Sequence, residues 1–96
     1  MSRGDGRSAS REVGTVLAVT PTGTLTVRAG GADAAEEGTI VTDRRGPFRG
    51  RVIRVFGPVA RPYLVVRPRR AVSLQEGVAL IGATLLRESR AEVEPR

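Results

Sequence analysis

The chain has 96 residues, of which 40% are hydrophobic and only 3% aromatic, and its formal net charge is +6. This length allows one domain with a small core, which Val, Leu, Ile and Ala must fill because aromatic side chains are so few. Without cysteine or histidine the chain cannot form disulfides or supply the usual zinc, copper or iron ligands. We therefore expect no metal, no cofactor and a reducing, cytoplasmic setting.

The first predicted elements are a flexible segment and a hairpin. Residues 1–11 are rich in Gly, Ser and Arg, a composition that does not support a packed structure. Alternating residues over 13–20 and 24–29 predict two strands. The turn residues 21–23 between them, Pro-Thr-Gly, predict a three-residue connection.

The rest of the chain also has the pattern of short strands. The segments concerned are 38–43, ending at Asp43, 49–56, 63–68 and 78–87, the last supplying one strand or two. Alternation over 49–56 places Val52, Arg54 and Phe56 on one face. No internal repeat, long amphipathic helix or membrane-length apolar run is present.

These elements favour a small all-β fold. Six or so short strands separated by Gly and Pro turns are typical of an antiparallel barrel, and closure protects the edges that a small open sheet exposes. We predict a six-stranded antiparallel β-barrel over 12–87, followed by a flexible C-terminal tail over 88–96.

The positive charge is concentrated in one block. Residues 44–70 contain nine arginines and no acidic residue. By contrast, residues 12–43 contain one arginine and five acidic residues, and residues 71–96 contain three arginines and four glutamates. The basic block could contact RNA phosphates or an acidic protein surface. Alternatively, its arginines only point to solvent and keep strand edges from aggregating.

The loop 57–62 joins two predicted strands and contains two prolines. Pro58 and Pro62 fix their own φ and restrict the residues before them, so this loop is stiff before it meets any partner. A stiff loop loses little conformational entropy on binding. We predict a partner-binding site in and beside it, consisting of Arg54, Phe56, Gly57, Pro58, Val59, Arg61, Pro62 and Tyr63.

The predicted roles within this site differ. Phe56, Val59 and Tyr63 offer apolar side chains of the kind that anchor interfaces, and Arg54 and Arg61 would form a charged rim. In another interpretation Phe56 belongs to the core, which the scarcity of aromatic residues favours for this one side chain, and Tyr63 closes the end of the barrel. The two prolines would then only enforce a tight connection. Composition and spacing alone do not choose between the two interpretations.

A motif gives this loop a family context. The stretch 50–69, GRVIRVFGPVARPYLVVRPR, resembles the signature of the Gar-type subunit of archaeal box H/ACA ribonucleoproteins. The shared pattern is a G-x-V element at Gly50 and Val52, the run VFGPV over 55–59, a P-Y pair at 62–63, a β-branched strand and then Pro68. The flanking strands also look similar, so the resemblance covers roughly residues 13–86.

The resemblance implies both a fold and a function. The family fold is a six-stranded barrel related to the translation-factor and reductase barrels. Its members are non-catalytic and dock on the catalytic domain of the pseudouridine synthase subunit, with contact to the other H/ACA proteins and the guide RNA only indirectly. They are thought to bias a mobile synthase loop that grips substrate RNA. Substrate loading and product release are thereby promoted in the guided pseudouridylation of ribosomal RNA, a step of ribosome biogenesis.

Two alternatives come from other classes. A free-standing RNA-binding barrel could track ribosomal RNA through residues 44–70, although single-strand readers use more aromatic stacking platforms than this chain offers. An enzyme would need a base, a nucleophile or a metal, and the candidates are Asp43, Glu36, Glu37 and Tyr63 with a few Ser and Thr. No His, Lys or Cys is present to tune them, so we expect no catalysis.

Overall fold

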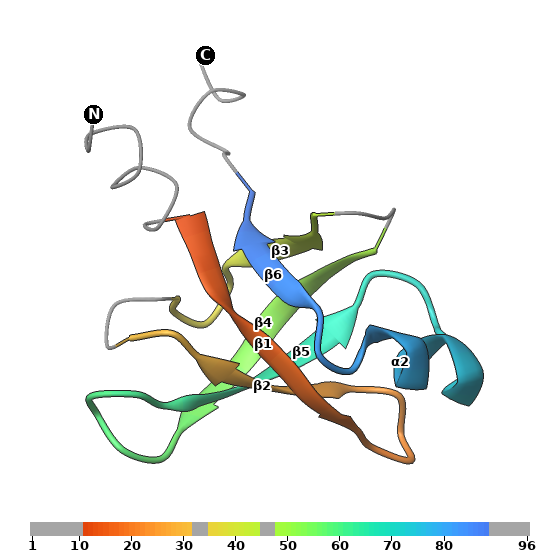
Figure 1. Cartoon of the computed structure of the whole chain (residues 1–96), viewed down its shortest axis with the longest axis horizontal. Helices are drawn as coiled ribbons and strands as arrows, with labels where there is room; N and C mark the ends of the chain where they lie inside the picture. Colours follow the sequence, from red (N-terminus) through yellow and green to blue (C-terminus); the bar gives the residue numbers. More distant parts are fainter. Residues whose placement is uncertain (1–10, 32–34, 45–47, 89–96) are drawn as a thin grey trace.

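The described residues form a closed barrel of six strands. The computed structural model describes residues 11–31, 35–44 and 48–88. Its elements are β1 (Glu12–Val19), β2 (Leu25–Ala29), β3 (Ile40–Asp43), β4 (Arg49–Phe56), β5 (Tyr63–Pro68), α2 (Leu74–Leu80) and β6 (Thr84–Arg87) (Figure 1). All neighbouring strands are antiparallel, in the closed order β1-β2-β5-β4-β3-β6. The predicted six-stranded antiparallel β-barrel is confirmed. The predicted flexible segments 1–11 and 88–96 lie outside the described residues, apart from Arg11 and Glu88.

The first hairpin has the predicted connection. The amide of Thr20 donates to the carbonyl of Thr24 at 2.9 Å, so the pairing of β1 with β2 continues to these residues and leaves 21–23 as the turn. Gly23 has φ +92°, a value that favours glycine, at the last turn position. The Pro-Thr-Gly sequence therefore forms the turn that its composition predicts.

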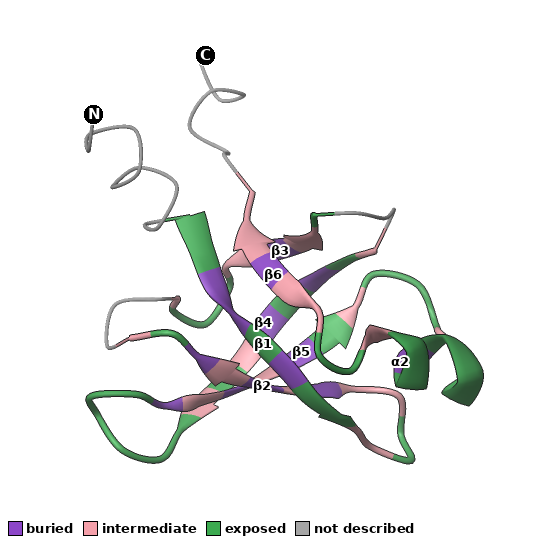
Figure 2. Ribbon diagram, viewed as in Figure 1, coloured by how far each residue is buried: buried purple, intermediate pink, exposed green. Residues whose placement is uncertain are grey.

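The barrel interior is aliphatic. Ten side chains, all at most 1% exposed, make up the core, and each is Val, Leu or Ala (Figure 2). They are Val13, Val16, Leu25, Val27, Ala29, Val41, Val52, Leu64, Val66 and Leu85. The expectation that aliphatic residues fill the core is met without isoleucine, since Ile40 and Ile53 are only half-buried.

A β-bulge in β4 corrects the predicted face of this strand. Val52 pairs with Val66, but Arg54 pairs with Val65, so Ile53 is an extra residue between them. The inserted residue shifts the alternation by one position. Val52 is therefore buried in the core while Arg54 and Phe56 are exposed, and the prediction that these three share a face is wrong.

Residues 78–80, predicted as the start of a strand, belong to α2 instead. Ser73 caps this helix, since its Oγ accepts from the amide of Glu76 at 3.0 Å and its own amide donates to Glu76 Oε1 at 2.8 Å. This capping box satisfies two amides that a helix leaves free, and buried Gly77 lets the helix approach Val19 closely. These contacts favour a helix over a strand at residues 78–80.

Among the residues that the structure describes, no helix has both the length and the apolar composition that a membrane span requires.

Candidate functional site

The loop 57–62 projects from one end of the barrel. It connects β4 to β5 beyond their last pair, Phe56 opposite Tyr63, and lies far from α2 (Figure 1). Residues 57–61 are exposed (Figure 2). Val59 is 86% exposed, the highest value among the exposed large hydrophobic side chains of the described residues. An aliphatic side chain is therefore presented to solvent at the tip.

Backbone and side-chain hydrogen bonds hold this loop in place. The amide of Arg61 donates to the carbonyl of Pro58 at 3.2 Å and closes a turn across the tip. The carbonyl of Pro62 accepts from the amide of Ala29 at 2.9 Å, which extends the pairing of β5 with β2. Arg61 Nε donates to the carbonyl of Ala29 at 3.1 Å. The second half of the loop is thus bonded to the end of β2, and only its tip stands clear of the barrel.

Beside the loop, four side chains form a row across the outside of β2, β5 and β4. The rings of Phe56 and Tyr63 are stacked, with centroids 5.5 Å apart and an interplanar angle of 24°. The Arg28 guanidinium carbon lies 4.5 Å from the Tyr63 ring centroid, and that of Arg54 lies 5.6 Å from the Phe56 centroid. We call Arg28, Tyr63, Phe56 and Arg54 the aromatic row. Each cation lies within the distance at which it is attracted to an aromatic ring.

The aromatic row excludes the interpretation in which Phe56 belongs to the core and Tyr63 closes the end of the barrel. Phe56 is 41% exposed and lies outside the core, because the bulge turns it outward and the inner pair beside it is Val55 and Leu64. Tyr63 alternates with buried Leu64 and also lies on the outer side, so it does not close the end of the barrel. Its hydroxyl accepts a 2.8 Å hydrogen bond from Arg28 Nη1. The pair of rings is therefore a surface feature.

The structure brings the eight predicted site residues together at this end, but in different roles. Gly57 to Val59 and Phe56 are exposed, whereas Pro62 is buried and can only support the loop. The Arg54 guanidinium lies against Phe56, and that of Arg61 is bonded back to β2. Both residues are exposed, and their role as a charged rim stays a prediction. Sequence reasoning missed Arg28. Its partner Tyr63 is on a strand 35 residues away, and only the β2–β5 pairing brings the two side by side.

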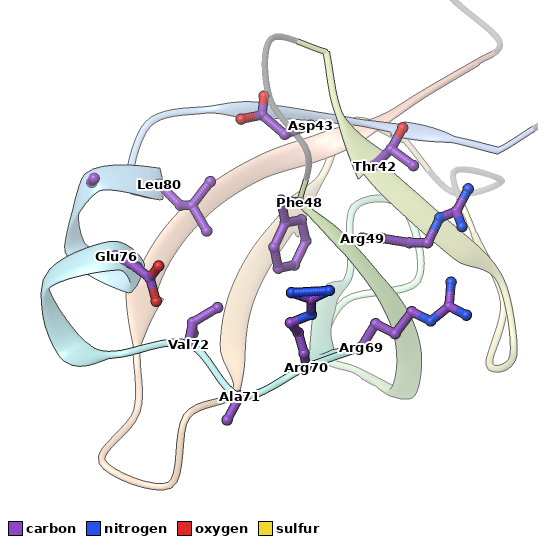
Figure 3. A pocket seen from close by; sticks show the side chains of 11 residues that line it. Thr42, Asp43, Phe48, Arg49, Arg69, Arg70, Ala71, Val72, Glu76 and Leu80 are labelled. Atoms are coloured by element: carbon purple, nitrogen blue, oxygen red, sulfur yellow. The ribbon is translucent and has the colours of Figure 1, made fainter.

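An open cleft of about 830 Å³ lies at the opposite end of β4 and β5 (Figure 3). Its lining consists of Thr42, Asp43, Phe48, Arg49, Arg69, Arg70, Ala71, Val72, Glu76, Ala79 and Leu80. Figure 3 shows Arg70 reaching toward Phe48, whereas Arg49 and Arg69 extend side by side away from it. No local pattern predicts this cleft, because the separate segments that line it meet only after the barrel closes.

The part of the chain that the structure describes contains no group of three or more His, Cys, Asp or Glu side chains that could hold a metal ion. No protein-family model matches the chain, and a search of curated proteins finds no match. The geometry of the loop and the motif around it must therefore carry any functional conclusion.

Proposed function

We propose that this protein is a non-catalytic subunit of an archaeal H/ACA ribonucleoprotein and binds the catalytic domain of the pseudouridine synthase subunit. The loop 57–62, together with Phe56, is the docking surface. Docking promotes the loading of substrate RNA and the release of product during guided pseudouridylation of ribosomal RNA. The protein contributes a binding surface to this reaction and no reacting group.

The observation that carries the proposal is the position of Val59. Its aliphatic side chain is 86% exposed at the tip of a loop whose second half is bonded to β2. Leaving such a side chain in water gains nothing for the fold, whereas burying it in a partner's pocket contributes to affinity. Because the loop is already held in one conformation, little entropy is lost when it docks. Val59 and Phe56 also lie within the stretch 50–69 that resembles the family signature.

Docking can influence catalysis without touching the reacting atoms. A subunit that binds one position of a mobile synthase loop more tightly than another shifts the population of that loop by the difference in binding free energy. Coupling of this kind is typically about 1–3 kcal/mol, which corresponds to roughly 5- to 150-fold in an equilibrium. A rigid docking surface suits this role because it favours one arrangement of its partner.

The docking surface can be tested by measuring the affinity of the full chain for the purified synthase subunit of the same organism. We expect Val59→Glu to weaken binding about 30-fold, the equivalent of roughly 2 kcal/mol for a buried anchor residue. Phe56→Ala should also weaken it while the barrel stays folded. The matched control is Leu74→Glu on α2, which makes the same type of change at a side chain that is 67% exposed.

The docking assignment fails if Val59→Glu binds the synthase as tightly as the unaltered chain, or if Leu74→Glu alone loses binding. A second measurement tests the effect on catalysis. Adding the chain to a particle of synthase, guide RNA and the remaining proteins should raise multiple-turnover pseudouridylation several-fold. The Val59→Glu variant should give no such increase at concentrations where the unaltered chain is saturating.

A free-standing RNA-binding barrel is the remaining alternative. The aromatic row offers one exposed stacked ring pair, and the described arginines of the basic block lie partly on the same strands. That alternative predicts tight RNA binding by the isolated chain and no affinity for the synthase. The affinity measurement above separates the two functions directly.

A further inference from the structure

A second basic feature occupies the end of β4 and β5 that is remote from the loop 57–62. Arg51 lies directly opposite Arg67, and both are exposed. The amide of Arg69 donates to the carbonyl of Arg49 at 2.8 Å, so these two residues form the next outward-facing pair along the strands. Figure 3 shows the side chains of Arg49 and Arg69 extending in the same direction. We call Arg49, Arg51, Arg67 and Arg69 the arginine ladder.

Three of the four arginines in the ladder have no acidic partner among the described residues. Like charges directly opposite one another on neighbouring strands destabilise a sheet. Of the four ladder residues, only Arg49 has an acidic partner among the described residues. Its Nη2 lies 3.1 Å from Glu88 Oε2. No carboxylate of that part of the chain is paired with Arg51, Arg67 or Arg69. The fold thus keeps an unfavourable arrangement that an anionic partner would make favourable.

The spacing of the ladder suits a linear polyanion. Successive outward residues on a strand are about 7 Å apart, so one pair of cations follows the other at a single step of this length along the strands. A guanidinium group can donate two parallel hydrogen bonds to a phosphate, and it stays charged at all physiological pH values. A nucleic acid backbone repeats its charge at every nucleotide, whereas acidic patches on proteins have no such regular repeat.

We propose that the arginine ladder binds the phosphodiester backbone of RNA without regard to base sequence. Arg51 lies about 17 Å from Phe56 along β4, at roughly 3.4 Å per residue. A chain docked through its loop would therefore still present the ladder to RNA held by the same particle. The ladder is separate from the loop 57–62, so RNA binding does not depend on the docking proposed above.

The test measures binding of the full chain, without synthase, to a labelled single-stranded RNA of mixed sequence over a series of salt concentrations. Each phosphate contact contributes about 0.7 to the slope of log K against log salt on a single strand. The double variant Arg51→Gln/Arg67→Gln should lower the slope by about 1.4 and weaken binding equally for every RNA sequence. The control Arg11→Gln/Arg44→Gln removes the same charge from exposed positions off the ladder and should change the slope much less.

Three outcomes overturn the inference. One is an equal loss of slope in the ladder variant and its control, which would assign RNA binding to net charge alone. Another is competition by polyglutamate that is as effective as competition by RNA at equal charge, which would indicate an acidic protein partner. The third is loss of synthase binding in Arg51→Gln/Arg67→Gln, which would make the ladder part of the docking surface. These three measurements do not involve the loop 57–62, so they test the ladder even if Val59→Glu has no effect on docking.

Discussion

The two ends of the β4–β5 pair place arginine side chains in different surroundings on the same outward face. At the loop end, Arg54 lies against the Phe56 ring, which is stacked on Tyr63. At the other end, Arg51 faces Arg67, and neither makes an ion pair or a ring contact with another described residue. The first arrangement stabilises the fold and the second opposes it. Arginines on one pair of strands therefore serve structure at one end and remain available for a partner at the other.

The interior beneath the two ends is nearly uniform. Val52 pairs with Val66 under the ladder end, and Val55 pairs with buried Leu64 beside the aromatic row. Such aliphatic pairs hold the strands together at both ends by the same burial of apolar surface. The outer surface can then differ without changing the fold, so substitutions inside and outside the barrel should separate stability from binding.

The largest expected effect comes from Gly50→Ala at the ladder end. A Cβ at this buried position would lie 2.8 Å from the Arg67 carbonyl oxygen and 2.8 Å from Val66 Cγ1. Because backbone cannot move away as a side-chain end can, β4 and β5 must separate locally. We expect the free energy of unfolding to fall by about 3 kcal/mol, measured by urea denaturation. Gly31→Ala, with nothing within 4 Å of its Cβ, is the control and should change stability by less than about 0.5 kcal/mol.

Gly57→Ala tests the loop end in the same way. Gly57 has φ +95°, which strains any L side chain, and its Cβ would lie 2.9 Å from Tyr63 Cδ2. We expect a loss of about 2 kcal/mol of stability together with weaker synthase binding, because the Tyr63 ring must shift. Gly38→Ala has nearly the same φ, +94°, and open space around its Cβ, so it isolates the backbone strain. Equal losses in both variants would show that the ring does not restrain the loop.

Much of the barrel could be predicted from sequence, because alternation and Gly or Pro turns are local signals. The hairpin 13–29 and the strand over 63–68 are examples. The bulge at Ile53 could not, since each residue of Val-Ile-Arg-Val fits a strand whether or not one is inserted. The helix α2 had a signal in Ser73-x-x-Glu76, but the apolar run after it also fits a strand. Local patterns do not distinguish such cases; tertiary packing does.

In the candidate site, too, some features have local sequence signals and others depend on tertiary packing. The loop 57–62 was visible as two prolines between strands, and its exposure agrees with the predicted surface role, while docking itself stays a prediction. The aromatic row and the arginine ladder both require the register between strands. Nine arginines in one block reveal a basic segment, but only the pairing of Arg51 with Arg67 shows that two of them lie opposite one another.

A smaller effect is expected from removing the Tyr63 hydroxyl. Arg28 Nη1 donates to it at 2.8 Å, and Arg28 Nε is buried without a partner among the described residues. Tyr63→Phe leaves a second donor of the same guanidinium unsatisfied, so we expect a loss of about 1 kcal/mol in urea denaturation. A double-mutant cycle with Arg28→Met should give a coupling of about 1 kcal/mol. Strictly additive effects of the two substitutions would show that the bond contributes nothing to stability.

The smallest predicted effects have opposite signs at the two ends. Arg51→Gln relieves the repulsion from Arg67, so stability at low salt should rise by about 0.3 kcal/mol, and the gain should shrink as salt screens the charges. Arg54→Gln removes the cation from the Phe56 ring and should lower stability by about 0.5 kcal/mol. Replicate thermal unfolding of both variants at low and high salt resolves the difference in sign. If both substitutions destabilise the barrel, Arg51 is held by a favourable contact, and the ladder is part of the fold rather than a free surface for a polyanion.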